Sequence, residues 1–255
     1  MLMTKDSDRS VTSVAGQSAL LAPRLSDYTL LPVELLIAGL SLAPLVILAC
    51  FYSVLPDRIP VFLDLHGAVQ VWAPKSIISV FRVPAMAIDL QVLCLLMKYG
   101  VVQSTSSLRA SEVEAYRQYE KRAIALSAAL WDWLRCFIAF KMCAESLDIL
   151  ITSQERLHFL ITTAWAIPWI AAILSIAGAL LYGYRLLVVK RQMKKAVGQI
   201  EVRKVDKAHL YGGLIYYNTA DPALFVNKYV FNFANKWLYV LLACLVAYPL
   251  LVFSV

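Results

Sequence analysis

The sequence predicts an all-α membrane protein with about five transmembrane helices. Hydrophobic residues make up 60% of the 255 residues and charged residues only 16%, whereas a soluble domain carries roughly 25% charged residues. The mean hydropathy of +0.67 agrees with a surface that largely meets lipid. A spanning helix needs about 20 mostly apolar residues, and five runs meet this requirement: 31–54, 77–99, 123–150, 157–187 and 237–255.

These runs divide the chain into four parts. Residues 1–28, rich in Ser, Thr and charge, are expected to form a flexible cytoplasmic tail. Residues 29–187 hold four spans and an outer loop at 55–76. Residues 188–236 form a basic and aromatic cytoplasmic module, and 237–255 form the fifth span. We expect no cleavable signal peptide, because the first apolar run begins late and is as long as a full span.

The distribution of positive charge predicts the orientation of the chain. With the N-terminus inside, 17 of the 24 Lys and Arg residues lie in inner segments and 3 lie in outer loops. This bias predicts an N-in, C-out, multi-pass protein of the cell (inner or cytoplasmic) membrane. Insertion topology and anionic lipid headgroups explain the net charge of +7. The lipid bilayer is therefore an expected partner, and nucleic acid is not.

The first two spans carry prolines and isolated charges. The first has Glu34 near its inner end and Pro44 in its middle, where proline is tolerated when neighbouring groups satisfy the freed carbonyl. The second span contains Arg82 and Asp89. An outer loop joins the two spans, and we expect Pro44 to kink the first helix.

The third and fourth spans differ in charge. The third contains five charged residues: Asp132, Arg135, Lys141, Glu145 and Asp148. The fourth is long for a bilayer, so it either tilts or projects inward through Lys195 as a basic amphipathic helix. We expect Glu145 or Asp148 to neutralise Arg82 of the second span.

Three of the charged side chains are predicted to meet within the membrane. Asp89 and Asp132 lie at nearly one depth when each span is counted from its inner end, and Arg135 is one turn beyond Asp132. A lone charge at mid-membrane costs at least roughly 2.5 kcal/mol. We therefore expect a cluster of Asp89, Asp132 and Arg135, which is either a clamp between two spans or a functional ion, proton or ligand site.

The outer loop 55–76 is too structured in sequence to be a passive connector. Its prolines restrict the backbone, and its Asp, His and Gly residues supply turn chemistry. The loop is either a recognition surface or a lid that seals the bundle. The candidate recognition residues are Pro56, Asp57, Arg58, Pro60, Asp64, His66, Gly67, Trp72 and Lys75.

The cytoplasmic module combines aromatic residues with turn residues. Two short extended pieces, 214–217 and 224–226, are predicted on either side of an Asx-type turn. The segment is either a docking site for a partner or an aromatic anchor at the headgroup level. Its candidate residues are Tyr216, Tyr217, Asn218, Asp221, Pro222, Phe225 and Lys228.

Signatures of enzymes are missing from the sequence. There is no H-E-x-x-H, Walker loop, G-x-S-x-G or dinucleotide fingerprint. The three histidines are scattered over both sides of the membrane, and the five cysteines all fall within spans as expected of small buried hydrophobes. We therefore predict no enzymatic activity, no metal and no cofactor.

The outer loop resembles the signature of a bacterial integral membrane family, domain of unknown function 1648, which includes SdpI-like proteins. The matching residues are Leu55, Pro56, Ile59, Pro60, Gly67, Trp72 and Lys75. The histidine of the family pattern falls on Phe62 here, and its aromatic residue falls on Leu63. The resemblance implies a multi-span membrane protein linked to peptide-toxin immunity or to signalling.

The cytoplasmic module resembles a second small module, domain of unknown function 5808. The matching residues are Tyr216, Tyr217, Asn218, Asp221, Pro222, Leu224, Phe225, Val226 and Lys228. The glycines that usually follow are missing, and Asn232-Phe233 comes early.

Three functions are consistent with these patterns. The first is a non-enzymatic sensor or immunity-like protein whose outer loop recognises a peptide or envelope component. The second is an accessory subunit of a larger membrane complex, and the third is a small proton- or ion-coupled transporter that uses Asp89 and Asp132.

Overall fold

A computed structural model describes residues 24–63, 69–105, 114–153, 159–197, 210–211, 215–219, 224–226 and 230–253. It is predominantly helical, and within the described residues each of the five apolar runs is largely helical. The helices are α2 (Leu31–Phe51), α3 (Ile77–Thr105), α4 (Glu114–Ser153), α5 (Phe159–Val197) and α6 (Lys236–Val252). Short 3-10 helices, η1 (Leu25–Tyr28) and η2 (Tyr52–Val54), flank α2.

Four of the described helices, α2 to α5, contain segments long and apolar enough to cross a membrane. Helix α6 is apolar but has only 17 residues, or about 26 Å at 1.5 Å per residue. Helices α4 and α5 have 40 and 39 residues, about 60 Å each, so both exceed a hydrocarbon core of about 30 Å. Helix α5 is continuous through Lys195, and whether it tilts or projects inward stays a prediction.

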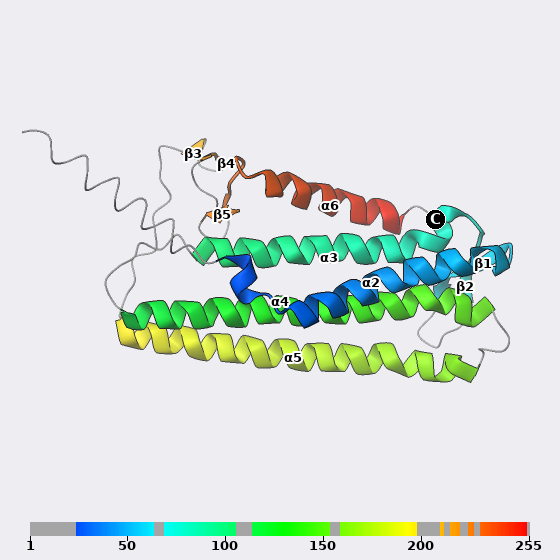
Figure 1. Cartoon of the computed structure of the whole chain (residues 1–255), viewed down its shortest axis with the longest axis horizontal. Coiled ribbons are helices and arrows are strands. Elements are labelled where there is room, and N and C mark those ends of the chain that lie inside the picture. The colour runs from blue at the N-terminus through cyan, green and yellow to red at the C-terminus, as the bar shows by residue number, and fades with distance from the viewer. Residues whose placement is uncertain are drawn as a thin grey trace, which may run out of the picture.

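The helices form an extended layer with one helix across it. Helix α3 lies between α6 and α4, and α4 lies between α3 and α5, so that the layer has the order α6, α3, α4, α5 (Figure 1). Helix α2 packs against both α3 and α4. Helix α5 contacts mainly α4, and its large apolar side chains therefore point largely away from protein.

The outer loop forms a β-hairpin. Strand β1 (Arg58–Leu63) pairs antiparallel with β2 (Val69–Pro74), with Ile59 opposite Ala73. β-branched and aromatic residues favour these strands, and Pro60 is accommodated beside a register shift. Ile59 is fully buried in a cluster with Leu48 of α2, Leu55 after η2, Val80 of α3 and Ile149 of α4.

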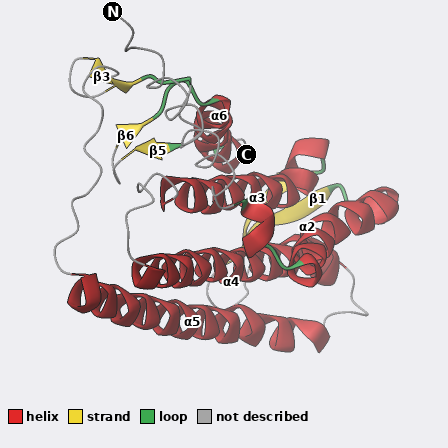
Figure 2. Ribbon diagram, turned by 60° about the vertical axis from the view of Figure 1, so that its left-hand side comes forward, coloured by secondary structure: helices red, strands yellow, loops and turns green. Residues whose placement is uncertain are grey.

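The described part of the module at 188–236 lies at the opposite end of the layer from the hairpin (Figure 1). It contains the short strands β3 (Leu210–Tyr211), β4 (Ile215–Tyr216), β5 (Phe225–Val226) and β6 (Val230–Phe231). The two predicted extended pieces appear as β4 and β5, but β4 pairs with β3 and β5 pairs with β6. Strands β5 and β6 lie side by side in Figure 2. Buried Leu224 attaches the module to α3 and α6.

Candidate functional site

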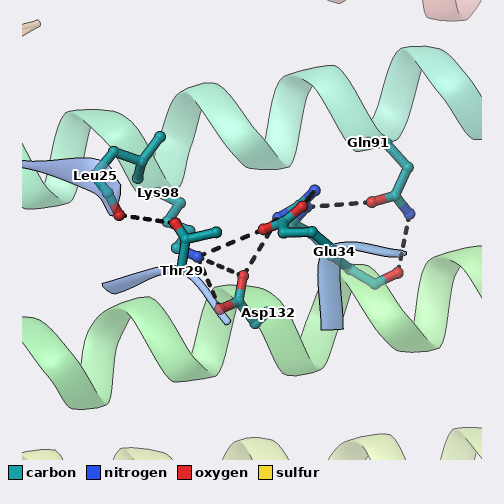
Figure 3. Close-up of polar contacts among 7 residues, drawn as sticks. Leu25, Thr29, Glu34, Gln91, Lys98 and Asp132 are labelled. Atoms are coloured by element: carbon teal, nitrogen blue, oxygen red, sulfur yellow. Dashed lines mark hydrogen bonds and ion pairs between the residues drawn. The ribbon is translucent and has the colours of Figure 1, made fainter. Parts of the chain in front are cut away.

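A network of four charged side chains joins α2, α3 and α4 (Figure 3). Arg135 of α4 donates two hydrogen bonds to Glu34 of α2, with Nη1–Oε1 at 2.7 Å and Nη2–Oε2 at 2.8 Å. Lys98 of α3 donates to both oxygens of Asp132, at 2.7 and 2.8 Å. Arg135 also contacts Asp132 at 3.3 Å. Two cations thus meet two anions, and their formal charges cancel.

Gln91 of α3 holds Arg135 from the other side. Its Nε2 donates to the backbone carbonyl of Arg135 at 2.9 Å, and the Arg135 Nε donates to Gln91 Oε1 at 3.3 Å. The Lys98 side chain is 0% exposed and that of Arg135 is 5% exposed. Buried charges persist only when paired and hydrogen-bonded. The network therefore fixes the packing of three helices.

The segment before α2 positions Glu34. Helix α2 starts at Leu31 with Pro32 in its first turn, where the missing N–H costs no intrahelical bond. Thr29, which follows η1, donates from its Oγ1 to the Leu25 carbonyl at 2.7 Å. Burial, together with the nearby Asp27 and Glu120 carboxylates, raises the pKa of the Tyr28 phenol above its usual value of 10.0, so this side chain is neutral.

The structure brings Asp132 and Arg135 together but places Asp89 elsewhere. Gln91 and Lys98 are seven residues apart on one face of α3, whereas Asp89 is two residues from Gln91 and so points away from them. Asp89 lies beside Cys244 of α6, and its Oδ2 is buried without a hydrogen-bond partner among the described residues. Counting residues from the inner end of a span gives the depth of a side chain, but not the face of α3 on which it lies.

Sequence reasoning missed the contributions of Lys98 and Glu34. Both residues stand near the inner ends of their spans, where a charged side chain is expected to reach the headgroups. The seven-residue spacing of Gln91 and Lys98 was an available signal, because it places two polar groups on one helical face. The depth of Glu34 was also visible in the sequence.

Arg82 joins three elements without a carboxylate partner in the described part of the chain. Its Nη2 donates to the Val61 carbonyl of β1 at 3.1 Å, and its Nη1 reaches the Val252 carbonyl at the end of α6 at 3.5 Å. The predicted partner Glu145 pairs with Lys141 instead. The carbonyls at a helix C-terminus carry partial negative charge, which suits a cation.

Lys75 fastens the base of the hairpin. Its Nζ donates to the Leu55 carbonyl at 2.7 Å, and its backbone N–H donates to the Asp57 carbonyl at 2.7 Å. The ammonium also lies 5.4 Å from the centre of the Tyr52 ring. The ammonium group of Lys75 is thus engaged in contacts that stabilise the base of the hairpin and is not free to bind a partner.

The other predicted loop residues divide by exposure. Pro56, Asp57 and Arg58 are exposed, as is Trp72, whereas Pro60 is buried. Asp64, His66 and Gly67 lie outside the described residues. The hairpin therefore buries its own Ile59 and presents Trp72 at 51% exposure.

The described part of the module at 188–236 is held together by the buried side-chain amide of Asn232. Asn232 is 0% exposed; its Oδ1 accepts from the backbone N–H groups of Asn218 and Ala234, and its Nδ2 donates to the Asn218 carbonyl. Tyr216 is also buried, while Tyr217 is exposed. Phe225 lies in β5.

The remaining predicted module residues, Asp221, Pro222 and Lys228, lie outside the described part of the chain. Within the described part, no group of three or more His, Cys, Asp or Glu residues is arranged to hold a metal ion.

The fold and its paired charges define the class of the protein: a helical, multi-pass membrane protein. Comparisons with protein-family models, with curated proteins and with solved structures found no match to this chain.

Proposed function

We propose that this chain is a non-enzymatic, sensor- or immunity-like protein of the cell membrane, and that its outer hairpin recognises a peptide or envelope component. The observation that carries the proposal is the hairpin itself. Lys75 bonds to its base and Arg82 bonds to strand β1, while Asp57, Arg58 and Trp72 are exposed. A pre-organised surface on a rigid scaffold loses little entropy when it binds a partner.

The charge network supports this proposal by favouring a structural role for the membrane core. Each of the four charged side chains lies within 3.3 Å of an oppositely charged one. This arrangement suits a fixed clamp between helices better than a path along which an ion moves. The proposed topology has five spans, N-in and C-out, so the hairpin faces outward and the aromatic module faces the cytoplasm. The resemblance of the loop to the SdpI-like family agrees with this arrangement.

The proposal is tested by exposing cells that express the chain to a panel of membrane-active peptides. We expect the wild-type chain to raise survival against at least one peptide, and the Asp57→Ala/Arg58→Ala double variant to lose this protection at an equal membrane level. The matched control is Lys194→Ala/Lys195→Ala, which changes exposed side chains at the far end of α5. Unchanged protection in the hairpin variant contradicts the proposal, as does an absence of protection by the wild type.

A second candidate, an accessory subunit of a membrane complex, is favoured by helix α5. This helix contacts mainly α4 and exposes large apolar residues, including Ile173 at 65% and Leu180 at 69%. A subunit predicts a partner that co-purifies at constant ratio in mild detergent, whereas a solitary sensor does not.

A further inference from the structure

An apolar cavity of about 360 Å³ opens between α4 and α5. Its walls include Trp133, Cys136, Phe137 and Phe140 from α4 and Leu174 and Ser175 from α5. None of the lining residues is charged, and the volume falls in the range of small-molecule sites, about 300–1,000 Å³. The ligand that fits such a lining is a hydrocarbon chain.

Gly178 of α5 creates the close approach that shapes this cavity. A Cβ at this position would lie 2.2 Å from Nε1 of Trp133, so only glycine admits the indole here. The Trp133 Nε1–H points to the Ser175 carbonyl at 3.4 Å, which satisfies its only donor. The aromatic wall is therefore held in place by α5.

Two arginines lie on the same side of the two helices as the cavity. Arg122 precedes Trp133 by eleven residues in α4, and Arg185 follows Leu174 by eleven residues in α5. Eleven residues make about three complete helical turns, so each arginine projects from the face of its helix that lines the cavity. Both side chains are exposed, and the ion pairs found among the described residues include neither.

The distance between the arginines and the cavity matches one leaflet. Because α4 and α5 are antiparallel neighbours (Figure 1), the two arginines reach the same end of the pair. The eleven-residue separation corresponds to about 17 Å along each axis, and half of the hydrocarbon core is about 15 Å. A phosphate held at the arginines would send its acyl chain to the depth of Trp133 and Leu174.

We propose that the groove between α4 and α5 binds an anionic phospholipid, with its phosphate between Arg122 and Arg185 and an acyl chain in the cavity. Two independent features carry this inference: an uncharged cavity at mid-membrane depth, and two exposed cations at headgroup depth on the same face. Guanidinium groups form bidentate hydrogen bonds with phosphate oxygens, which favours this headgroup contact. The site is separate from the outer hairpin and does not depend on the function proposed for it.

The proposal is tested by native mass spectrometry of the purified full-length chain with palmitoyl-oleoyl phosphatidylglycerol or the matching phosphatidylcholine. We expect one phosphatidylglycerol to be retained in preference to phosphatidylcholine, and Arg122→Gln/Arg185→Gln to bind it roughly thirtyfold more weakly. The matched control, Lys121→Gln/Lys194→Gln, removes the same charge from exposed positions off the cavity face. Equal losses in both double variants, or no loss in either, would overturn the proposal.

A second readout follows the acyl chain. Cys136 lines the cavity, and its alkylation can be measured alone once Cys50, Cys94, Cys143 and Cys244 are replaced by Ala. Phosphatidylglycerol should slow alkylation of Cys136 severalfold relative to phosphatidylcholine, and the Arg122→Gln/Arg185→Gln change should remove this protection. Equal alkylation rates in the two lipids would contradict preferential occupation of the cavity by a chain of the anionic lipid.

Discussion

Replacing Arg135 with Gln tests whether the buried charges hold the bundle together. The change removes two hydrogen bonds to Glu34, at 2.7 and 2.8 Å, and one contact with Asp132 at 3.3 Å. It leaves two carboxylates facing the single ammonium of Lys98, which is 0% exposed. Breaking a buried ion pair by removing one partner costs about 3–5 kcal/mol, so we expect a loss of this size in the free energy of unfolding.

A second substitution that restores neutrality separates the effect of an unpaired charge from the effect of lost packing. Glu34→Gln with Arg135→Gln restores neutrality, because the Lys98–Asp132 pair persists. We expect this double variant to be no less stable than either single variant, since replacing a whole buried pair is often nearly neutral. The control is Lys141→Gln. Its pair with Glu145 is more than one-third exposed, so this change should cost less than about 1 kcal/mol.

The assay is reversible unfolding in mixed micelles by titration with a denaturing detergent, followed by circular dichroism. The reasoning is refuted if Arg135→Gln costs no more than Lys141→Gln. It is also refuted if the effects of Glu34→Gln and Arg135→Gln simply add, because additive effects would show that the two side chains do not stabilise each other.

Three further changes probe other parts of the molecule. Gly178→Ala should cost about 1–3 kcal/mol, because the new Cβ meets Trp133 at 2.2 Å; thermal unfolding measures this, and an unchanged midpoint counts against the close packing. Asn232→Ala leaves buried backbone groups without partners and should raise amide exchange in residues 215–219 while the exchange of α4 is unchanged. Asp89→Asn should not lower stability, because it removes a carboxylate whose Oδ2 is buried without a hydrogen-bond partner among the described residues, and it should abolish ion flux in proteoliposomes only if the chain is a transporter. An absence of flux in the wild type counts against transport.

The sequence predicted the helical membrane class because apolar runs of span length leave few alternatives. It placed Asp132 and Arg135 together because they are one turn apart on a single helix. Which residues of α3 join Asp132 and Arg135 depends on how α3 is rotated about its axis. Counting residues along a span gives the depth of a side chain but not this rotation. In the structure Lys98 and Gln91 face the cluster, and Asp89 does not.

The hairpin was harder to predict for a local reason. Pro60 within the run 58–63 argued against a strand, but a register shift accommodates it. In the module at 188–236 the positions of β4 and β5 were predictable from composition, whereas their pairing was not. Each strand has only two residues, and their partners are chosen by tertiary contacts such as the buried Asn232 and Leu224.

The function proposed for the hairpin is tested most directly by photo-crosslinking in living cells. A photoreactive phenylalanine analogue at position 72, where Trp72 is 51% exposed, should capture a peptide or envelope component. The Asp57→Ala/Arg58→Ala change should abolish that adduct at an equal membrane level. An adduct that persists in this variant, or a constant-ratio adduct with another membrane protein, would contradict recognition by the hairpin and favour a subunit of a complex.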